Sequence, residues 1–292
     1  MTSDHEPRTP SPGPRNTERS EATHIGAALL LEVEQIEVVY HRVATAIQGV
    51  SLRLPADQIV ALVGPNGAGK TTTLRAISGF LDADNAQVTE GRISFLGEVI
   101  NGLPPHRLAR RGLVLVSERD KIFESLTVQE NLQASHHPQR PGRPTIDLEM
   151  VLEYFPFLTP RRRQLAGTLS GGERQMLAVA CSLLCQPVVL LVDELSLGLA
   201  PLVVQHLMAT LRRLREELGL AILLVEQNVS AALDIADYGY VIENGRIVYD
   251  GTAEQLAQSE DIQEFYLGLA RDHAAKSYRD VKQYRRRRRW FG

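Results

Sequence analysis

Residues Gly64–Thr71 read Gly-Pro-Asn-Gly-Ala-Gly-Lys-Thr, which matches the phosphate-binding pattern G-x-x-x-x-G-K-[ST] at every fixed position. The apolar run Ile59–Val63 precedes the loop and has the length of a buried strand, and the helix-like run Thr71–Ile77 follows it. A strand, a glycine-rich loop and a helix in this order distinguish a phosphate loop from an ordinary glycine-rich turn. The sequence therefore predicts an α/β fold with a phosphate-binding loop.

The residue types in this loop suit a nucleoside triphosphate. The glycines let the backbone turn tightly, so that its N–H groups point toward phosphate oxygens, and the helix N-terminus adds a partial positive charge. Lys70 supplies a mobile cation for the β- and γ-phosphates, and the Thr71 hydroxyl is a ligand for Mg²⁺. The predicted nucleotide-binding residues of the loop are Gly64, Asn66, Gly67, Ala68, Gly69, Lys70, Thr71 and Thr72.

A second group of motifs lies further along the chain. Leu169–Gln175 reads Leu-Ser-Gly-Gly-Glu-Arg-Gln, and a helical run, Met176–Leu184, follows. The apolar strand Val188–Val192 then ends in Asp193 and Glu194. Asp193 is placed to hold the Mg²⁺ shell, and Glu194 is placed to polarise a water for attack on the γ-phosphate.

Together these motifs resemble the ATP-binding cassette (ABC) ATPases, and within them the ATP-binding subunits of branched-chain amino acid importers. The resemblance extends from about residue 30 to about residue 269. The stretches that indicate the subgroup are Leu103–Arg107, Leu126–Leu132, Ser196–Val204 and Val225–Asn228. The family implies a P-loop NTPase fold of the α/β class, with a parallel core sheet, an antiparallel β subdomain and a helical subdomain.

The resemblance also implies roles for residues outside the loop. Tyr40 matches an aromatic residue that stacks on adenine, although a core tyrosine at a strand end is the alternative. Ser170, Gly171 and Gly172 are expected to contact ATP bound to a second ABC ATPase subunit, which is the same chain or a related one.

Two positions depart from the commoner pattern of the superfamily. Glu118 occupies a position that usually holds Gln, where its carboxylate is expected to reach Mg²⁺ or the attacking water. Gln227 occupies the position of a His that senses the γ-phosphate, and its amide can donate a hydrogen bond but cannot become cationic. The predicted catalytic residues are therefore Glu194, Gln227 and Glu118, and the predicted metal ligands are Thr71, Asp193 and Glu118.

The composition suits one globular domain with flanking extensions. The chain has 292 residues, of which 43% are hydrophobic and 23% charged, and a net charge of −3. We expect a disordered N-terminal extension over residues 1–27, an ABC ATPase domain over 28–269 with its helical subdomain at about 119–168, and a basic tail over 270–292. No apolar run approaches the ~18–20 residues that cross a bilayer, so a pore must come from other chains.

Some features leave alternatives open. Cys181 and Cys185 lie one helical turn apart, and buried small side chains are favoured over a redox or metal role. Phe123, Leu126 and Val128 either form part of a docking groove for transmembrane subunits or fill the core of the helical subdomain.

The C-terminal tail also has more than one interpretation. Arg285–Arg289 is a run of five arginines, and Trp290 and Phe291 follow it. The tail binds anionic membrane lipid or a partner, binds nucleic acid, or is a solvated disordered segment.

These observations predict the ATP-hydrolysing subunit of an importer for branched-chain amino acids or similar small polar solutes. The expected cofactors are ATP and Mg²⁺. The expected partners are transmembrane permease subunits, a second ABC ATPase subunit and, indirectly, an extracytoplasmic solute-binding protein, with the chain at the cytoplasmic face of the membrane. The alternatives are the ATPase of a lipid-type exporter and a non-transport ABC ATPase.

Overall fold

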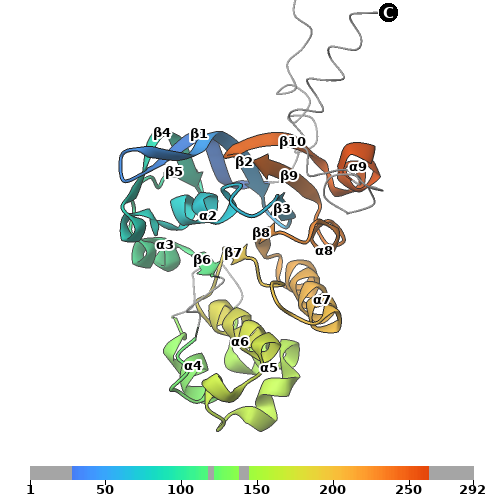
Figure 1. Cartoon of the computed structure of the whole chain (residues 1–292). Coiled ribbons are helices and arrows are strands. Elements are labelled where there is room, and N and C mark those ends of the chain that lie inside the picture. Colours follow the sequence, from blue (N-terminus) through green and yellow to red (C-terminus); the bar gives the residue numbers. More distant parts are fainter. Residues whose placement is uncertain (1–27, 118–121, 138–144, 263–292) are drawn as a thin grey trace, which may run out of the picture.

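The computed structural model describes residues 28–117, 122–137 and 145–262. The predicted N-terminal extension, Glu118 and the basic C-terminal tail therefore lie outside the described residues. The described chain forms two sheets and a group of helices that extends to one side of them (Figure 1).

The smaller sheet is antiparallel and contains the first strands of the chain. Its strand order is β2-β1-β4-β5. Alternating side chains of the long strand β1 are buried, because one face of the sheet packs on the core while the other does not. The strands are β1 (Leu29–Tyr40), β2 (Ala44–Pro55), β4 (Ala86–Phe95) and β5 (Glu98–Val99).

The larger sheet carries the phosphate loop. Its strand order is β10-β9-β3-β8-β7-β6, and the neighbouring pairs from β9 to β6 are parallel. Strands β3, β7 and β8 are buried at every residue, which explains their continuous apolar sequences. The strands are β3 (Ile59–Val63), β6 (Leu113–Val116), β7 (Val189–Asp193), β8 (Ala221–Glu226), β9 (Tyr238–Glu243) and β10 (Arg246–Thr252).

The last two strands form the hairpin that the Asn-Gly pair predicts. Asn244 and Gly245 connect β9 to β10, and both have positive φ angles, 49° and 74°. This backbone geometry matches the twist of the flanking strands. The hairpin also contacts the phosphate loop, because the Gly245 N–H donates to the Ala68 carbonyl at 2.8 Å.

Helices cover both faces of the larger sheet. Helix α2 contacts strands of both sheets and so lies between them (Figure 1). Helix α8 contacts strands β3 and β8, and α7 packs beside α8. The buried side chains of α7 recur at helical spacing and form its core-facing side. These helices are α2 (Lys70–Ser78), α3 (Pro105–Arg111), α7 (Pro201–Leu218), α8 (Val229–Leu233) and α9 (Ala253–Gln258).

A helical part lies below the larger sheet in Figure 1. It contains α4 (Val128–Ala134), α5 (Leu148–Tyr154) and α6 (Gly171–Leu184), with 3₁₀ turns at Pro156–Arg161 and Ala166–Thr168. Its buried side chains belong to the same hydrophobic cluster as one face of the sheet. The fold class predicted from the sequence is therefore confirmed.

The structure distinguishes between a core role and a docking role for Phe123, Leu126 and Val128. Val128 is fully buried in the core, whereas the side chain of Phe123 is 62% exposed and Leu126 is partly exposed. The core role therefore holds for Val128, and Phe123 is the residue that a docking partner can reach.

Candidate nucleotide-binding site

The phosphate loop connects the buried strand β3 to helix α2 and depends on its glycines for space. Gly69 has a φ of 107°, and a Cβ there would lie 2.7 Å from Ile47 Cδ1. A Cβ at Gly64 would lie 2.2 Å from the Ile242 carbonyl oxygen. Only glycine fits at either position, which keeps the backbone N–H groups close to any bound anion.

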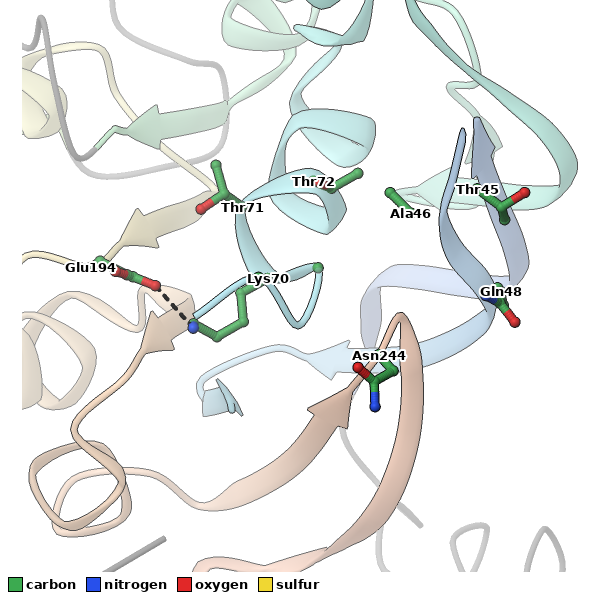
Figure 2. Close-up of a pocket in the computed structure, with 10 residues that line it drawn as sticks. Thr45, Ala46, Gln48, Lys70, Thr71, Thr72, Glu194 and Asn244 are labelled. Atoms are coloured by element: carbon green, nitrogen blue, oxygen red, sulfur yellow. Dashed lines mark ion pairs between the residues drawn. The ribbon is translucent and has the colours of Figure 1, made fainter. Parts of the chain in front are cut away.

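The loop forms one wall of a cavity of about 410 Å³. Figure 2 shows Glu194 facing Lys70 across the loop, and Asn244 at the tip of the β9–β10 hairpin. The cavity is lined by Thr45, Ala46, Gln48, Gly67, Gly69, Lys70, Thr71, Thr72, Glu194 and Asn244. Five of these residues belong to the predicted nucleotide-binding set, and Glu194 is the predicted catalytic base.

Lys70 is buried, with 3% of its surface exposed, and its ammonium group makes three contacts. Its Nζ lies 3.0 Å from Glu194 Oε1, and it donates to the carbonyl oxygens of Gly64 at 2.8 Å and Pro65 at 3.0 Å. The Glu194 carboxylate neutralises the lysine in this arrangement. A phosphate oxygen can take the place of that carboxylate beside Lys70, which would leave Glu194 available to a water.

The predicted metal ligands on the loop and on β7 are also together. The Thr71 hydroxyl donates to Asp193 Oδ1 at 3.2 Å. A hydroxyl and a carboxylate at the mouth of a phosphate loop are the oxygen ligands that Mg²⁺ takes when it also binds substrate phosphates. The donor set of the structure therefore fits Mg²⁺.

Strand β8 holds the segment that follows Asp193. Glu194 has a φ of 45°, and its N–H donates to the Val225 carbonyl at 2.9 Å. The buried carboxylate of Glu226, at the end of β8, accepts hydrogen bonds from Ser196. The pKa of the Glu226 carboxyl is raised to about 7, mainly by burial and also by the nearby Glu194 and Asp193 carboxylates, although the hydrogen bonds from Ser196 oppose the shift.

The signature residues do not line this cavity. Ser170 caps helix α6: its hydroxyl donates to Glu173 Oε2 at 2.8 Å, and the Glu173 N–H donates back to the hydroxyl at 3.3 Å. This cap starts the helix at Gly171, so the helix is longer than the run beginning at Met176 that the sequence predicts. The Ser170 backbone N–H lowers the pKa of Glu173, and Arg161 lies 3.1 Å from the same carboxylate.

The other predicted site residues are placed as follows. Tyr40 does not line the cavity, but its hydroxyl lies 3.2 Å from Thr72 Oγ1, which does. Within the loop, Ala68 is buried and Asn66 is exposed, and Gln227 is exposed just after β8. Glu118 is outside the described residues.

Sequence reasoning missed the cavity residues of β2. Thr45, Ala46 and Gln48 reach the loop from the antiparallel sheet, and no motif marks them. Asn244 belongs to an Asn-Gly pair, which indicates only a turn, although the apposition of the hairpin to the loop also makes it part of the site. Such contacts depend on how the two sheets pack, which local patterns do not encode.

A second cavity, of about 600 Å³, lies between α2, β6 and α6. Arg75, Phe80 and Ser117 line it together with Cys181 and Cys185. Burial raises the pKa of the Cys181 thiol to about 12, so this cysteine is not an activated nucleophile. Within the described ranges, no three or more His, Cys, Asp and Glu side chains gather in the arrangement of a metal site.

Comparison with known proteins identifies the family. The model of the ABC transporter family matches residues 47–196. A high-affinity branched-chain amino acid transport ATP-binding protein, BraG of Pseudomonas aeruginosa, is 39% identical over 239 residues, which are 82% of this chain and 100% of that protein. The lipopolysaccharide export system ATP-binding protein LptB of Haemophilus influenzae is 35% identical over 225 residues, 76% of this chain and 90% of that protein.

Solved structures agree with the sequence comparisons. The ADP conformation of an ATP-binding cassette of an ABC transporter superposes with a TM-score of 0.69 at 25% identity, covering 82% of this chain and 99% of that one. The chain belongs to the ABC transporter family. As a member of it, the chain is an ATPase subunit of an ABC transporter.

In the part of the chain that the structure describes, no helix is both long and apolar enough to cross a membrane.

Proposed function

We propose that this chain is the ATP-hydrolysing subunit of an importer for branched-chain amino acids or similar small polar solutes. The observation that carries the proposal is the 39% identity to the BraG subunit over that protein's entire length. A related subunit from Archaeoglobus fulgidus, named as a probable branched-chain amino acid transport ATP-binding protein, is 38% identical over 213 residues.

The site geometry supports specific roles for the residues. The loop N–H groups and Lys70 bind the phosphates, and Tyr40 stacks on the adenine. Thr71 and Asp193 would hold Mg²⁺, which would neutralise charge on the β- and γ-phosphates. Glu194 would leave its ion pair with Lys70 and accept a proton from the attacking water. From the family resemblance we also propose that Gln227 donates to the γ-phosphate and that Glu118, which lies outside the described residues, is a metal ligand.

The site is proposed to be completed by a second ATPase subunit. Ser170, Gly171 and Gly172 lie at the N-terminal end of α6, where Ser170 and Gly171 are exposed and Gly172 is buried, and none of the three lines the cavity of their own chain. Two subunits in head-to-tail arrangement would place this helix end against the nucleotide of the other. The N–H groups of the helix start and the Ser170 hydroxyl then face the γ-phosphate.

The proposed assembly places the chain at the cytoplasmic face of the membrane, against permease subunits. The second cavity supports this docking because it lies between α6 of the helical part and β6 of the sheet, and Phe123, beside α4, adds an exposed apolar side chain. An extracytoplasmic solute-binding protein would deliver the solute to the permeases. The basic tail, residues 270–292, is a further proposed contact with anionic lipid.

The proposal is tested by uptake of radiolabelled leucine in host cells whose own copy of this chain carries Glu194→Gln. We expect uptake to fall about a hundredfold or more, because the isosteric amide cannot act as a base. Glu98→Gln, at an exposed surface pair with Arg111, is the matched control and should leave uptake unchanged.

The similarity to LptB favours a second candidate, an exporter of lipid-type cargo. The same cells distinguish the two. In cells that carry Glu194→Gln, leucine uptake would be unchanged if the chain serves the exporter, and large antibiotics would enter the cells more readily. That result would contradict the importer and support the exporter.

A further inference from the structure

Glu226 is a buried carboxylate that binds the chain just beyond the proposed catalytic base. It ends strand β8, and 1% of its surface is exposed. Its Oε1 accepts a hydrogen bond from the Ser196 N–H at 3.1 Å, and its Oε2 accepts one from the Ser196 hydroxyl. Ser196 lies two residues after Glu194.

A second contact joins the same two segments. The Glu194 N–H donates to the Val225 carbonyl at 2.9 Å, so consecutive residues of β8 hold both Glu194 and Ser196. Leu195, between them, is fully buried. Glu194 itself has a φ of 45°, a left-handed conformation that a residue with a side chain keeps only where its surroundings hold it.

Burying the Glu226 carboxylate costs free energy, and a residue that only filled space at this strand end would not need a carboxylate. A buried carboxylate beside Asp193 and Glu194 is unfavourable, and burial is the main reason that its pKa is raised to about 7. An apolar side chain at this strand end would avoid that cost, but it could not hold the Ser196 N–H and hydroxyl.

We propose that Glu226 is a positioning residue for ATP hydrolysis. It holds the turn at Glu194 so that the catalytic carboxylate faces the nucleotide cavity, and it joins this turn to Gln227, the next residue in the chain. The inference rests on the catalytic role proposed for Glu194.

Three substitutions separate this role from simple packing. Glu226→Ala removes both acceptors for Ser196. In Glu226→Gln the amide oxygen still accepts from the Ser196 N–H, and the amide NH₂ donates to the Ser196 hydroxyl, so both contacts survive with one reversed. Ser196→Ala removes only the hydroxyl contact.

The experiment uses the transporter complex that copurifies with the tagged full-length chain from its host. Steady-state hydrolysis of Mg-ATP gives kcat and KM, and titration of the purified chain with Mg-ATP gives the affinity. Denaturant unfolding of each variant records stability, and Glu194→Gln is measured in parallel.

We expect Glu226→Ala to lower kcat by about ten- to about a hundredfold, because a small displacement of a reacting group has this effect, while affinity for Mg-ATP stays within about threefold. Glu226→Gln should recover most of the rate. Ser196→Ala should lower kcat little further when added to Glu226→Ala, because Glu226→Ala already removes the hydroxyl contact that Ser196→Ala removes.

A wild-type kcat in Glu226→Ala would overturn the inference. So would equal losses in Glu226→Ala and Glu226→Gln that follow the loss of stability. If Glu226→Ala does not fold, Ser196→Ala decides: a normal kcat in that variant rejects the positioning role. Normal hydrolysis by Glu194→Gln would instead reject the proposed base and remove the inference with it.

Discussion

The phosphate loop and the signature segment are built in opposite ways. Around the loop, side chains from distant parts of the sequence meet: Thr71 binds Asp193, which is 122 residues away, and Lys70 binds Glu194. At the signature, the contacts are local, because Ser170 binds Glu173 three residues on. The first region lines a cavity, and the second is an exposed helix end.

This difference suggests that the loop binds the nucleotide of its own subunit and that the signature contacts the nucleotide of a second subunit. The loop region places Lys70, Glu194 and Thr71 around one cavity, with Asp193 hydrogen-bonded to Thr71, and we propose that it binds a nucleotide by itself. The signature offers a preformed helix N-terminus whose residues do not line that cavity, and we propose that it contacts a nucleotide held by another subunit.

The largest expected effect is loss of nucleotide binding at the loop. Lys70→Ala removes the buried ammonium group and leaves the Glu194 carboxylate unpaired. We expect affinity for Mg-ATP, measured by calorimetry on the full-length chain, to fall about a hundredfold or more.

Arg75→Ala is the matched control for this change. Arg75 lies on the same helix but binds Asp84 and lines the other cavity. Equal losses of affinity in both variants would show that the helix, rather than the lysine, determines binding.

A second prediction compares the two signature glycines. A Cβ at Gly172 would lie 2.5 Å from Val203 Cγ1, whereas a Cβ at Gly171 would lie 3.8 Å from Leu199 Cδ2, an ordinary contact. We expect Gly172→Ala to lower the free energy of unfolding by about 1–3 kcal/mol and Gly171→Ala to leave it unchanged or slightly raised. Denaturant unfolding of the two variants measures this difference, and equal stabilities would contradict the packing of α6 on α7.

The smallest predicted effect concerns the adenine. Tyr40→Ala removes the ring and its contact with Thr72, and we expect Mg-ATP affinity to fall about tenfold, which is the size of one base–aromatic stack. Tyr40→Phe keeps the ring and should retain most of the affinity. If the two variants lose affinity equally, the hydroxyl contact rather than stacking is responsible.

The fold was largely predictable because its strongest patterns are local. Strand β3 has the predicted bounds, and β7 differs by one residue at each end. The hairpin at Asn244 follows from its turn residues. The start of α6 was misplaced although Ser170 and Glu173 form a recognisable capping pair, because the glycines between them argue against a helix.

The candidate site was only partly predictable, for a physical reason. Motifs name residues such as Lys70 and Asp193, whose chemistry and spacing are distinctive. They do not reveal Gln48, which reaches the cavity through packing of one sheet on the other, or Glu226, whose partner is 30 residues away. Contacts of this kind depend on the tertiary arrangement and leave no periodic or local pattern.

The division of work between subunits is tested most directly by one affinity measurement on the isolated full-length chain. Calorimetric titration with Mg-ATP compares the wild type, Lys70→Ala and Ser170→Ala. We predict that Ser170→Ala binds Mg-ATP within about twofold of the wild type while Lys70→Ala loses about a hundredfold, since only the lysine touches the nucleotide of its own chain. A loss in Ser170→Ala as large as that in Lys70→Ala would contradict the account.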